Sequence, residues 1–311
     1  MPNDNYDFPI PTINGQKITV DWLVNDPRRI YRLLRTLVQQ RLIGYRLLTG
    51  RVDLTGTGSG IYEISESIFS EQQGSVVNPL AEYPLTGAGV STLATVKPNK
   101  TGLKTLISDE AIAHNRIDKV MRDLVKMANR LAFQADAVAL AAIASAVTKT
   151  VAAAASWSST STANAFLDVL LAGASIEEEN QGYSADTVAT TPTLFANAIG
   201  AAVKQGLLPR EQAGNAITRD VNTIDIAGYT WLKTTNMPGG VSAIVLDSTM
   251  LGSLAYERLG GGYQGDPSDM ASGVESKRYR EEDIDGVNVQ ARVVRAPMVQ
   301  EPNSARVVTG V

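Results

Sequence analysis

The chain has 311 residues, a formal net charge of −4, one histidine and no cysteine. Its length allows two domains of ordinary size. Without cysteine it forms no disulfide, thiolate metal site or cysteine nucleophile, and the mild charge argues against a dedicated nucleic-acid binder. Residues 1–10 lack a basic segment followed by an apolar one, and the longest apolar run is too short for a bilayer. We therefore expect neither a signal peptide nor a membrane partner.

Residues 1–20 predict an extended arm with a possible turn at Asn14-Gly15. Asp26-Pro27 then predicts a helix start, because Asp is a good N-cap and Pro is favoured at the first helical position. The helix is expected to reach Leu42 and to stop at Gly44. It is locally basic, which fits either a solvated face or a surface that meets a polyanion or an acidic partner protein. The residues concerned are Arg28, Arg29, Arg32 and Arg35.

A long polar segment over residues 51–96 predicts two strands and a wide loop. Apolar and polar residues alternate over 62–68 and again over 90–96, the pattern of half-buried strands. Two isolated strands are marginally stable in water. This hairpin therefore needs another surface to lie on, most simply a neighbouring subunit.

The most regular pattern predicts one helix over residues 107–147, with Ser108 as its N-cap. A helix of this length crosses a whole domain and organises what packs on it. Its apolar residues recur in alternating steps of three and four. They are Ile117, Met121, Leu124, Ala128, Leu131, Ala135, Val138 and Ala142.

The following segment, residues 155–270, mixes helices and strands. Helices are expected over 166–179 and 191–205, a loop over 206–222, and strands over 187–190, 224–234 and 241–246. Asp247-Ser248 is expected to cap a further helix that continues through Tyr256.

The chain is expected to close with strands over 279–284, 287–294 and 305–309. Asp285-Gly286 predicts a hairpin turn between the first two. A helix needs a partner layer to cover its apolar stripe, so we expect these strands to pack on the long helix.

No residue cluster predicts catalysis. His114 is the only histidine, so it has no His or Cys partner for a metal site and no evident nucleophile. Residues 260–265 match a dinucleotide-binding spacing, but they follow an expected helix and open none. The three glutamates at 177–179 point in different directions on a helix, which favours a solvated helix end. We therefore expect no enzyme, no catalytic or metal-binding residue and no cofactor.

Several short stretches carry a family resemblance when taken in this order. They are LISDE at 106–110, ADA at 135–137, IAGY at 226–229, AIVLD at 243–247 and ARVVTG at 305–310. Together with the arm, hairpin, long helix and mixed domain, they resemble the major capsid protein of tailed bacteriophages with the HK97-type fold. The likeness covers most of residues 45–311.

The resemblance implies an α+β, HK97-type capsid fold. Its parts would be an N-terminal arm and helix at 1–50, an E-loop hairpin at 51–100, a P-domain with the spine helix at 101–154 and 271–311, and an A-domain at 155–270. The chain would self-assemble into pentamers and hexamers of an icosahedral shell enclosing phage DNA. It would be assembled in the host bacterial cytoplasm and reside in the virion.

The resemblance also implies partners. They would be further copies of the chain, a separate scaffolding protein, a portal, double-stranded DNA contacted without sequence specificity, and a decoration protein. Arg28, Arg29, Arg32 and Arg35 would face inward, toward scaffold first and DNA later. Some family members cross-link through a lysine on the hairpin, but no lysine lies between Lys17 and Lys97, so we expect no such bond.

Three other interpretations stay open. The first is an encapsulin, a nanocompartment of the same fold that holds a cargo enzyme. The sequence does not separate an encapsulin from a phage capsid protein. An enzyme that uses Asp and Glu chemistry is a second alternative, although one histidine and no cysteine argue against it. A DNA-binding protein that uses the N-terminal arginines is a third, and the acidic overall charge argues against it.

Overall fold

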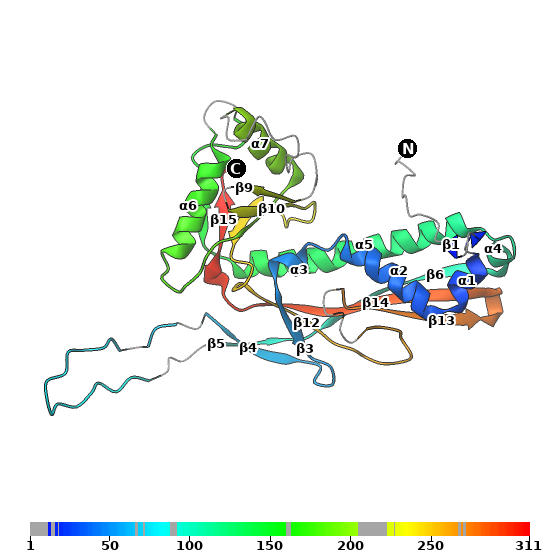
Figure 1. Cartoon of the computed structure of the whole chain (residues 1–311), viewed down its shortest axis with the longest axis horizontal. Coiled ribbons are helices and arrows are strands. Elements are labelled where there is room, and N and C mark those ends of the chain that lie inside the picture. The colour runs from blue at the N-terminus through cyan, green and yellow to red at the C-terminus, as the bar shows by residue number, and fades with distance from the viewer. Residues whose placement is uncertain are drawn as a thin grey trace. The chain divides into compact units, whose positions relative to one another are not determined.

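The computed structural model describes residues 12–13, 16–17, 19–65, 68–70, 72–87, 92–159, 163–204, 223–226, 228–266, 269 and 272–311 (Figure 1). The chain forms two compact units. The first unit contains residues 1–42, 99–134 and 258–294, and the second contains residues 43–98, 135–257 and 295–311.

The expected N-terminal arm is described only in part. Strands β1 (Thr12–Ile13) and β2 (Gln16–Lys17) pair antiparallel. The expected turn at Asn14-Gly15 lies outside the described residues, as does the expected loop over 206–222.

The basic helix predicted after Asp26 is present as α2 (Pro27–Gln39), in the first unit. Asp26 caps it as predicted, since its carboxylate accepts the Arg28 N–H at 3.0 Å. Apolar residues at helical spacing form its buried face, so the arginines lie on the sides of the helix that remain. The buried residues are Ile30, Tyr31, Leu34, Leu37 and Val38.

Gly44 was expected to end this helix. Instead, α2 ends at Gln39, and Gly44 begins α3 (Gly44–Leu47) in the second unit. The N–H groups of Gly44 and Ile43 donate to the Asp136 carboxylate at 2.8 and 3.0 Å, so a side chain distant in sequence caps α3. A β-carbon on Gly44 would lie 2.9 Å from Ala139 Cβ, so this close approach requires glycine. Burial raises the pKa of Asp136, although the two N–H donors oppose that shift.

The single helix expected over residues 107–147 is two helices, α4 (Asp109–Ala113) and α5 (Ile117–Ala146). The interruption lies at Asn115, which has a left-handed φ of 49°. Its side chain accepts the N–H of Val20 at 2.8 Å, at the start of α1 (Val20–Asn25). The prediction missed the interruption because its cause is this contact between residues far apart in sequence.

The apolar stripe of α5 is confirmed in the first half of the helix and shifted in the second. Leu124, Ala128 and Leu131 are buried as expected, whereas Val138 is 43% exposed and Leu140 is buried in its place. Alternating steps of three and four have a period of 3.5 residues, and a straight helix rotates away from that period by about 20° per heptad. The expected stripe therefore leaves the buried face as the helix proceeds.

The closing strands are longer than expected. β13 (Val274–Glu281) pairs antiparallel with β14 (Gly286–Val299). The 3-10 helix Glu282–Ile284 and Asp285 join them, so the connection is longer than the predicted turn at Asp285-Gly286, and Gly286 already belongs to β14. Asp285 adopts φ 39° there. β6 (Asn99–Ser108), which was not predicted from the sequence, is a strand that also pairs with β14. Ser108 ends it and caps α4 as predicted.

The segment expected as a helix after Asp247-Ser248 is instead strand β12 (Gly252–Tyr256), which lies between β14 and β3 (Gly50–Asp53). The Asp247 carboxylate accepts the Thr249 N–H at 2.9 Å and closes a turn rather than starting a helix. All of β12 is buried. A short, mostly apolar run fits a buried strand as well as a helix, and only the flanking strands distinguish the two.

The second unit contains a six-stranded sheet in the order β7, β15, β11, β8, β10, β9. The bounds of these strands, in that order, are Thr150–Ala152, Ala305–Thr309, Ala243–Leu246, Thr187–Thr190, Tyr229–Lys233 and Thr223–Ile226. The single strand expected over 224–234 is the hairpin β9–β10, because the chain reverses at Gly228, with φ 85°. Two strands of this sheet, β7 and β15, lie outside the range of 155–270 expected for the A-domain. The expected domain limits remain a prediction.

Helices α6 (Ala165–Glu177) and α7 (Pro192–Lys204) are present near their predicted positions and pack on this sheet. Their shared core includes Phe166 and Trp231, whose ring centroids lie 5.4 Å apart. Strand β15 also lies in one apolar cluster with Leu140 of α5, so the last strand packs on the long helix as predicted.

Gly173 of α6 provides the first testable prediction. A β-carbon there would collide with the Tyr229 hydroxyl, so Gly173→Ala should lower the free energy of unfolding by about 1–3 kcal/mol. Gly200 of α7 has open space at that position, so Gly200→Ala should be neutral or stabilising by up to about 1 kcal/mol. Urea unfolding of the unassembled subunit measures both, and equal effects in the two variants would refute the packing argument.

Candidate assembly surfaces

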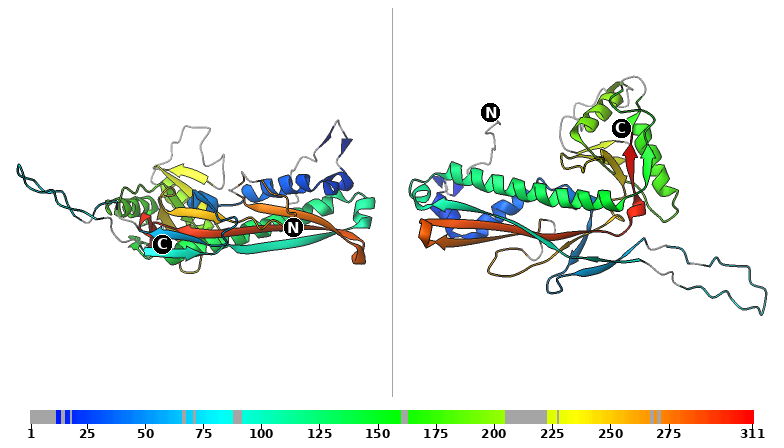
Figure 2. Two further views of the ribbon diagram at one scale, coloured as in Figure 1. Left: turned by 90° about the horizontal axis from the view of Figure 1, so that it is seen from below. Right: turned by 180° about the vertical axis from the view of Figure 1, so that it is seen from behind.

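A β-hairpin projects from the rest of the second unit (Figure 2). Its strands β4 (Gly60–Ile64) and β5 (Thr92–Val96) pair antiparallel, close to the predicted positions. Leu54 and Tyr62 pack the base of the hairpin onto residues of β12 and β14. Ile68, expected in the first strand, lies beyond its end, and the start of the expected return strand lies outside the described residues.

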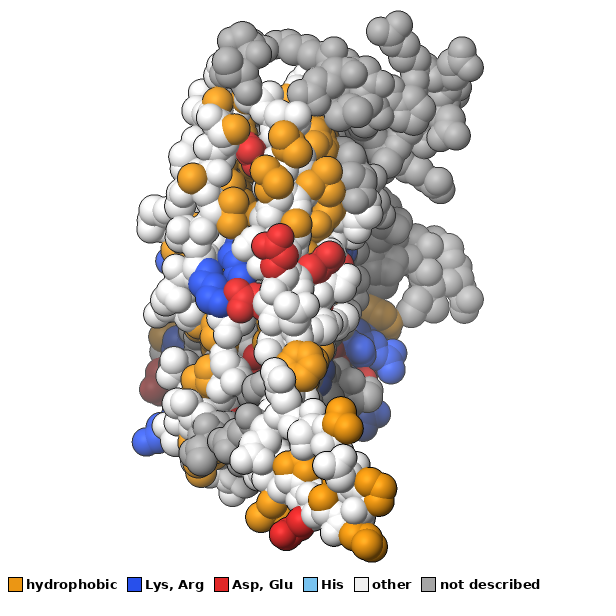
Figure 3. Space-filling model, turned by 90° about the vertical axis from the view of Figure 1, so that its left-hand side faces the viewer, with side chains coloured by type: hydrophobic (Ala, Val, Ile, Leu, Met, Phe, Trp, Pro, Cys, Tyr) orange, Lys and Arg blue, Asp and Glu red, His pale blue; other side chains and the backbone are white. Residues whose placement is uncertain are grey.

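Beyond these strands, the described hairpin residues form no helix or strand and expose apolar side chains (Figure 3). Val76 is 99% exposed and Leu80 is completely exposed. Residues 52–96 contain five acidic residues and no lysine or arginine. An apolar surface of this kind marks an interaction site rather than a solvated loop. The other large apolar residues of this surface are Ile68, Phe69, Tyr83 and Leu85, together with Ile61 and Leu93 on the strands themselves.

Leu80 occupies an unusual backbone conformation. The Ala81 N–H donates to Asn78 O at 2.9 Å, which closes a turn with Pro79 and Leu80 at its centre. Leu80 has φ 71°, at a turn position where glycine or asparagine is the usual residue. A large residue held in left-handed backbone costs roughly 1–3 kcal/mol. Leu80 is therefore both strained in its backbone and completely exposed in its side chain.

A second apolar surface lies on helix α6. Its inner face is buried against the six-stranded sheet, but Leu167, Leu170 and Leu171 are 46%, 44% and 53% exposed. Figure 3 shows a cluster of hydrophobic side chains above a group of acidic ones. Exposed Glu177 and Glu178 follow the leucines at the end of the helix. The helix is therefore apolar on both faces, which is typical of a helix that has a second packing partner.

The four arginines predicted as one functional group are not equivalent. Arg29 lies 3.6 Å from the centre of the Trp22 ring and is bonded to the Trp22 carbonyl and to Asp26. Arg35 forms ion pairs within the chain, whereas Arg28 and Arg32 are exposed. Neither exposed side chain has an ion pair or hydrogen bond within the described part of the chain.

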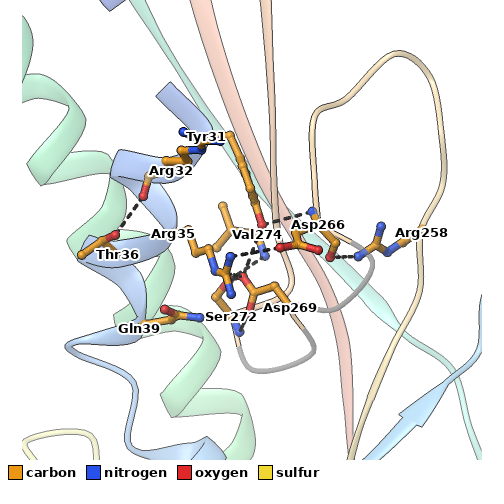
Figure 4. A network of polar contacts seen from close by, with 10 residues as sticks. All are labelled: Tyr31, Arg32, Arg35, Thr36, Gln39, Arg258, Asp266, Asp269, Ser272 and Val274. Carbon is orange, nitrogen blue, oxygen red and sulfur yellow. Dashed lines mark hydrogen bonds and ion pairs between the residues drawn. The ribbon is translucent and has the colours of Figure 1, made fainter. Parts of the chain in front are cut away.

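Arg35 belongs to a polar network that attaches α2 to the loop before β13 (Figure 4). Its guanidinium lies 2.9 Å from the Asp269 carboxylate and 3.1 Å from that of Asp266. The side chain of Asp269 is 2% exposed and also accepts from Gln39 at 3.0 Å. Burial of this carboxylate is tolerated because several donors surround it.

Tyr31 completes the network from the preceding turn of α2. Its hydroxyl donates to Asp269 at 3.4 Å and accepts the Asp266 N–H at 3.1 Å. Burial, followed by the Asp269 charge, raises the pKa of Tyr31. The partners lie more than 200 residues apart. The sequence carries no local signal for them, so the prediction treated Arg35 as a surface arginine.

The remaining candidate motifs have different surroundings, and Glu179 departs from the expected solvated helix end because it forms ion pairs within the chain. His114 is exposed at the end of α4. In the loop at 260–265, the carbonyl of Gly260 accepts from Arg292 at 2.7 Å and that of Gly261 accepts from Lys277 at 2.9 Å. Glu179 bonds Lys149 and Arg306, and the Lys149 bond is the main reason that its pKa is lowered.

The described residues contain no group of three or more His, Cys, Asp or Glu side chains arranged to hold a metal ion. They also contain no helix that is long and apolar enough to cross a membrane.

The comparisons with known proteins point to one family. Residues 92–308 match the family model described as phage capsid protein. Among solved structures, the chain is similar to the capsid of cyanophage P-SCSP1u, with 15% identity, a TM-score of 0.58, and coverage of 86% of this chain and 87% of that one. A structure from Microbacterium phage Oxtober96 has 12% identity, a TM-score of 0.57, and coverage of 86% and 90%. No curated protein matches the sequence.

A virus-like particle from Pyrococcus furiosus is similar at 12% identity and a TM-score of 0.55, with coverage of 90% of this chain and 98% of that one. At these identities the structural likenesses show the fold, and the family model shows the family. The mixed helices and sheets, with a projecting hairpin and a long helix, match the HK97-type architecture of these capsid structures. The chain therefore belongs to the phage capsid protein family and is a capsid shell protein with the HK97-type fold of tailed bacteriophages.

Proposed function

We propose that the chain self-assembles into pentamers and hexamers of an icosahedral shell that encloses phage DNA, with no enzymatic role. The exposed apolar hairpin carries this proposal. A monomer gains nothing from fully exposed side chains such as Val76 and Leu80. Burying apolar surface is worth about 25 cal/mol per Å², so covering several such side chains supplies a substantial contact energy.

The strained turn at Leu80 supports the same proposal. Backbone strain persists where it serves an interaction, and an outlier in the structure motivates a functional hypothesis. Leu80 projects at the turn, so it is placed to enter an apolar recess of a neighbouring copy. Aromatic and aliphatic anchors at the centre of an interface typically carry most of its energy.

A closed shell also needs a second surface on the same chain. Head-to-tail contacts that close into rings join two different patches, one on each copy. The leucines of α6 are a second apolar patch in the second unit. The hairpin and α6 together supply the pair of dissimilar surfaces that a ring of subunits requires.

The partners of the shell follow from the same proposal. We place the chain in the virion after assembly in the host cytoplasm, with a separate scaffolding protein, a portal and a decoration protein as partners. The inward-facing role expected for four arginines reduces to Arg28 and Arg32, because Arg29 and Arg35 already have partners within the chain. The lack of lysine between 17 and 97 supports a shell without hairpin cross-links.

A nanocompartment shell of the same fold is the alternative. This alternative is supported by the similarity to the Pyrococcus furiosus virus-like particle, because that match spans 90% of this chain. Electron microscopy of particles made from the chain with its neighbouring genes separates the two proposals. Dense nucleic acid inside supports the phage capsid, and an enclosed enzyme supports the nanocompartment.

Polar substitutions in the hairpin should stop shell formation without unfolding the subunit. In the triple variant Val76→Ser, Leu80→Ser, Leu85→Ser, each change removes exposed apolar area that only a partner would cover. Negative-stain microscopy should show shells or capsomer rings for the unmodified chain and none for this variant.

A matched control tests whether the position of those side chains matters. The triple variant Met250→Ser, Leu259→Ser, Ile284→Ser also removes three exposed apolar side chains, at 40%, 45% and 49% exposure, outside the hairpin. It should assemble. Normal shells from the hairpin variant would contradict the proposal. An unchanged circular dichroism spectrum shows that the variant subunit is folded.

The α2 arginines should separate into structural and exposed pairs. Arg35→Ala removes the main charged partner of buried Asp269 and should lower the free energy of unfolding by about 1–3 kcal/mol. Arg32→Ala, on the exposed side of the same helix, should change it by less than about 0.5 kcal/mol. Hydrogen exchange of the α2 amides measures the difference, and equal protection in both variants would contradict it.

A further inference from the structure

Helix α5 carries an exposed row of positive side chains in the first unit. Lys119, Arg122, Lys126 and Arg130 are all exposed. Their spacing of three or four residues places them within an arc of about 80° on a helix with 3.6 residues per turn. The row therefore forms one narrow stripe along the helix.

The buried side of the helix holds this stripe outward. Val120, Leu124, Ala128 and Leu131 are buried between the positive residues in sequence. Rotating the helix to hide the cations would expose these apolar side chains. Transfer of one large apolar side chain to water costs about 1.5–3 kcal/mol. The direction of the stripe is therefore a consequence of the core.

The stripe has no ion-pair partner within the described part of the chain. Asp118 and Asp123 are the acidic residues of the same stretch, so residues 117–130 keep a net charge of 4 − 2 = +2 in a chain of net charge −4. The Arg130 guanidinium lies 5.6 Å from the centre of the Phe133 ring, which leaves its charge available. By contrast, half of the arginines first considered on α2 are occupied within the chain.

We propose that the α5 stripe is a contact site for the phosphate backbone of double-stranded DNA. This inference rests on the proposed function, because it requires the chain to enclose DNA. With a rise of about 1.5 Å per residue, cations three or four residues apart lie roughly 5 Å apart along the helix, a spacing that lets successive side chains reach successive phosphates. Such contacts carry no sequence information, as packaging of a whole genome requires.

An acidic protein segment is the competing ligand. The hairpin of a second copy is the obvious source, since residues 52–96 have five acidic residues and no basic one. Those acids are spaced irregularly, by 10, 3, 5 and 11 residues, and so do not repeat at the spacing of the stripe. An evenly charged polyanion matches four evenly spaced cations better.

The test compares two double variants of the full chain. Arg122→Gln/Lys126→Gln removes two charges from the middle of the stripe with a residue that suits helices. Lys97→Gln/Lys100→Gln removes two charges from exposed lysines elsewhere and serves as the control. Binding of a 30-base-pair duplex is measured by fluorescence anisotropy over a range of salt concentrations, and shell formation is followed by electron microscopy.

The stripe variant should reduce the slope of log affinity against log salt by about 1.8, since each phosphate contact contributes about 0.9. That reduction corresponds to a loss of affinity of about 60-fold at 0.1 M salt. The control should keep the slope of the unmodified chain. Equal losses in the two variants would mean that only overall charge matters and would overturn the proposal.

Two further outcomes separate the inference from the function it rests on. Unchanged DNA binding with loss of shells in the stripe variant would assign the stripe to a second copy and would overturn the DNA contact. A second outcome is that the unmodified chain never forms shells, while the stripe variant alone loses DNA affinity. That outcome would contradict the proposed function and support the DNA contact.

Discussion

Burial of one face of helix α5 is the constraint on which the rest of the structure depends. Leu124, Ala128 and Leu131 anchor its first half in the first unit, and Leu140 and Ile143 join the core of the second unit. Because the buried face sets the rotation of the helix, it also determines which residues face solvent. The cap that Asp136 provides to α3 and the outward direction of the cation stripe both follow from that rotation.

The hairpin obeys the opposite constraint, because most of the large apolar side chains described beyond its base are exposed. Leu54 and Tyr62 pack that base, but the apolar side chains further out remain exposed. A protein selected only for monomer stability would replace them with polar residues. A subunit that must join others keeps them, since surface left uncovered in one copy is available for contact with the next.

Charge is distributed by the same logic of local partners. The buried Asp269 carboxylate is stable only when hydrogen-bond donors or a cation surround it. Arg35 pairs with it within the chain and is therefore not available to a partner protein. The side chains of Arg28 and Arg32, one helical turn apart, are exposed and form no ion pair within the described residues. A count of arginines along α2 therefore overstates the positive charge that this helix offers, and the less conspicuous cations of α5 offer more.

The sequence by itself determined the elements whose signals are local. The Asp26 and Ser108 caps, the alternating hairpin strands and the helical period of α5 all depend on residues a few positions apart, and the order of these parts was enough to suggest the capsid fold. Only the tertiary structure decided the interruption at Asn115, the strand identity of β12 and the role of Arg35. Each of these depends on a partner that lies far away along the chain, and a pattern read within a short window contains no information about such a partner.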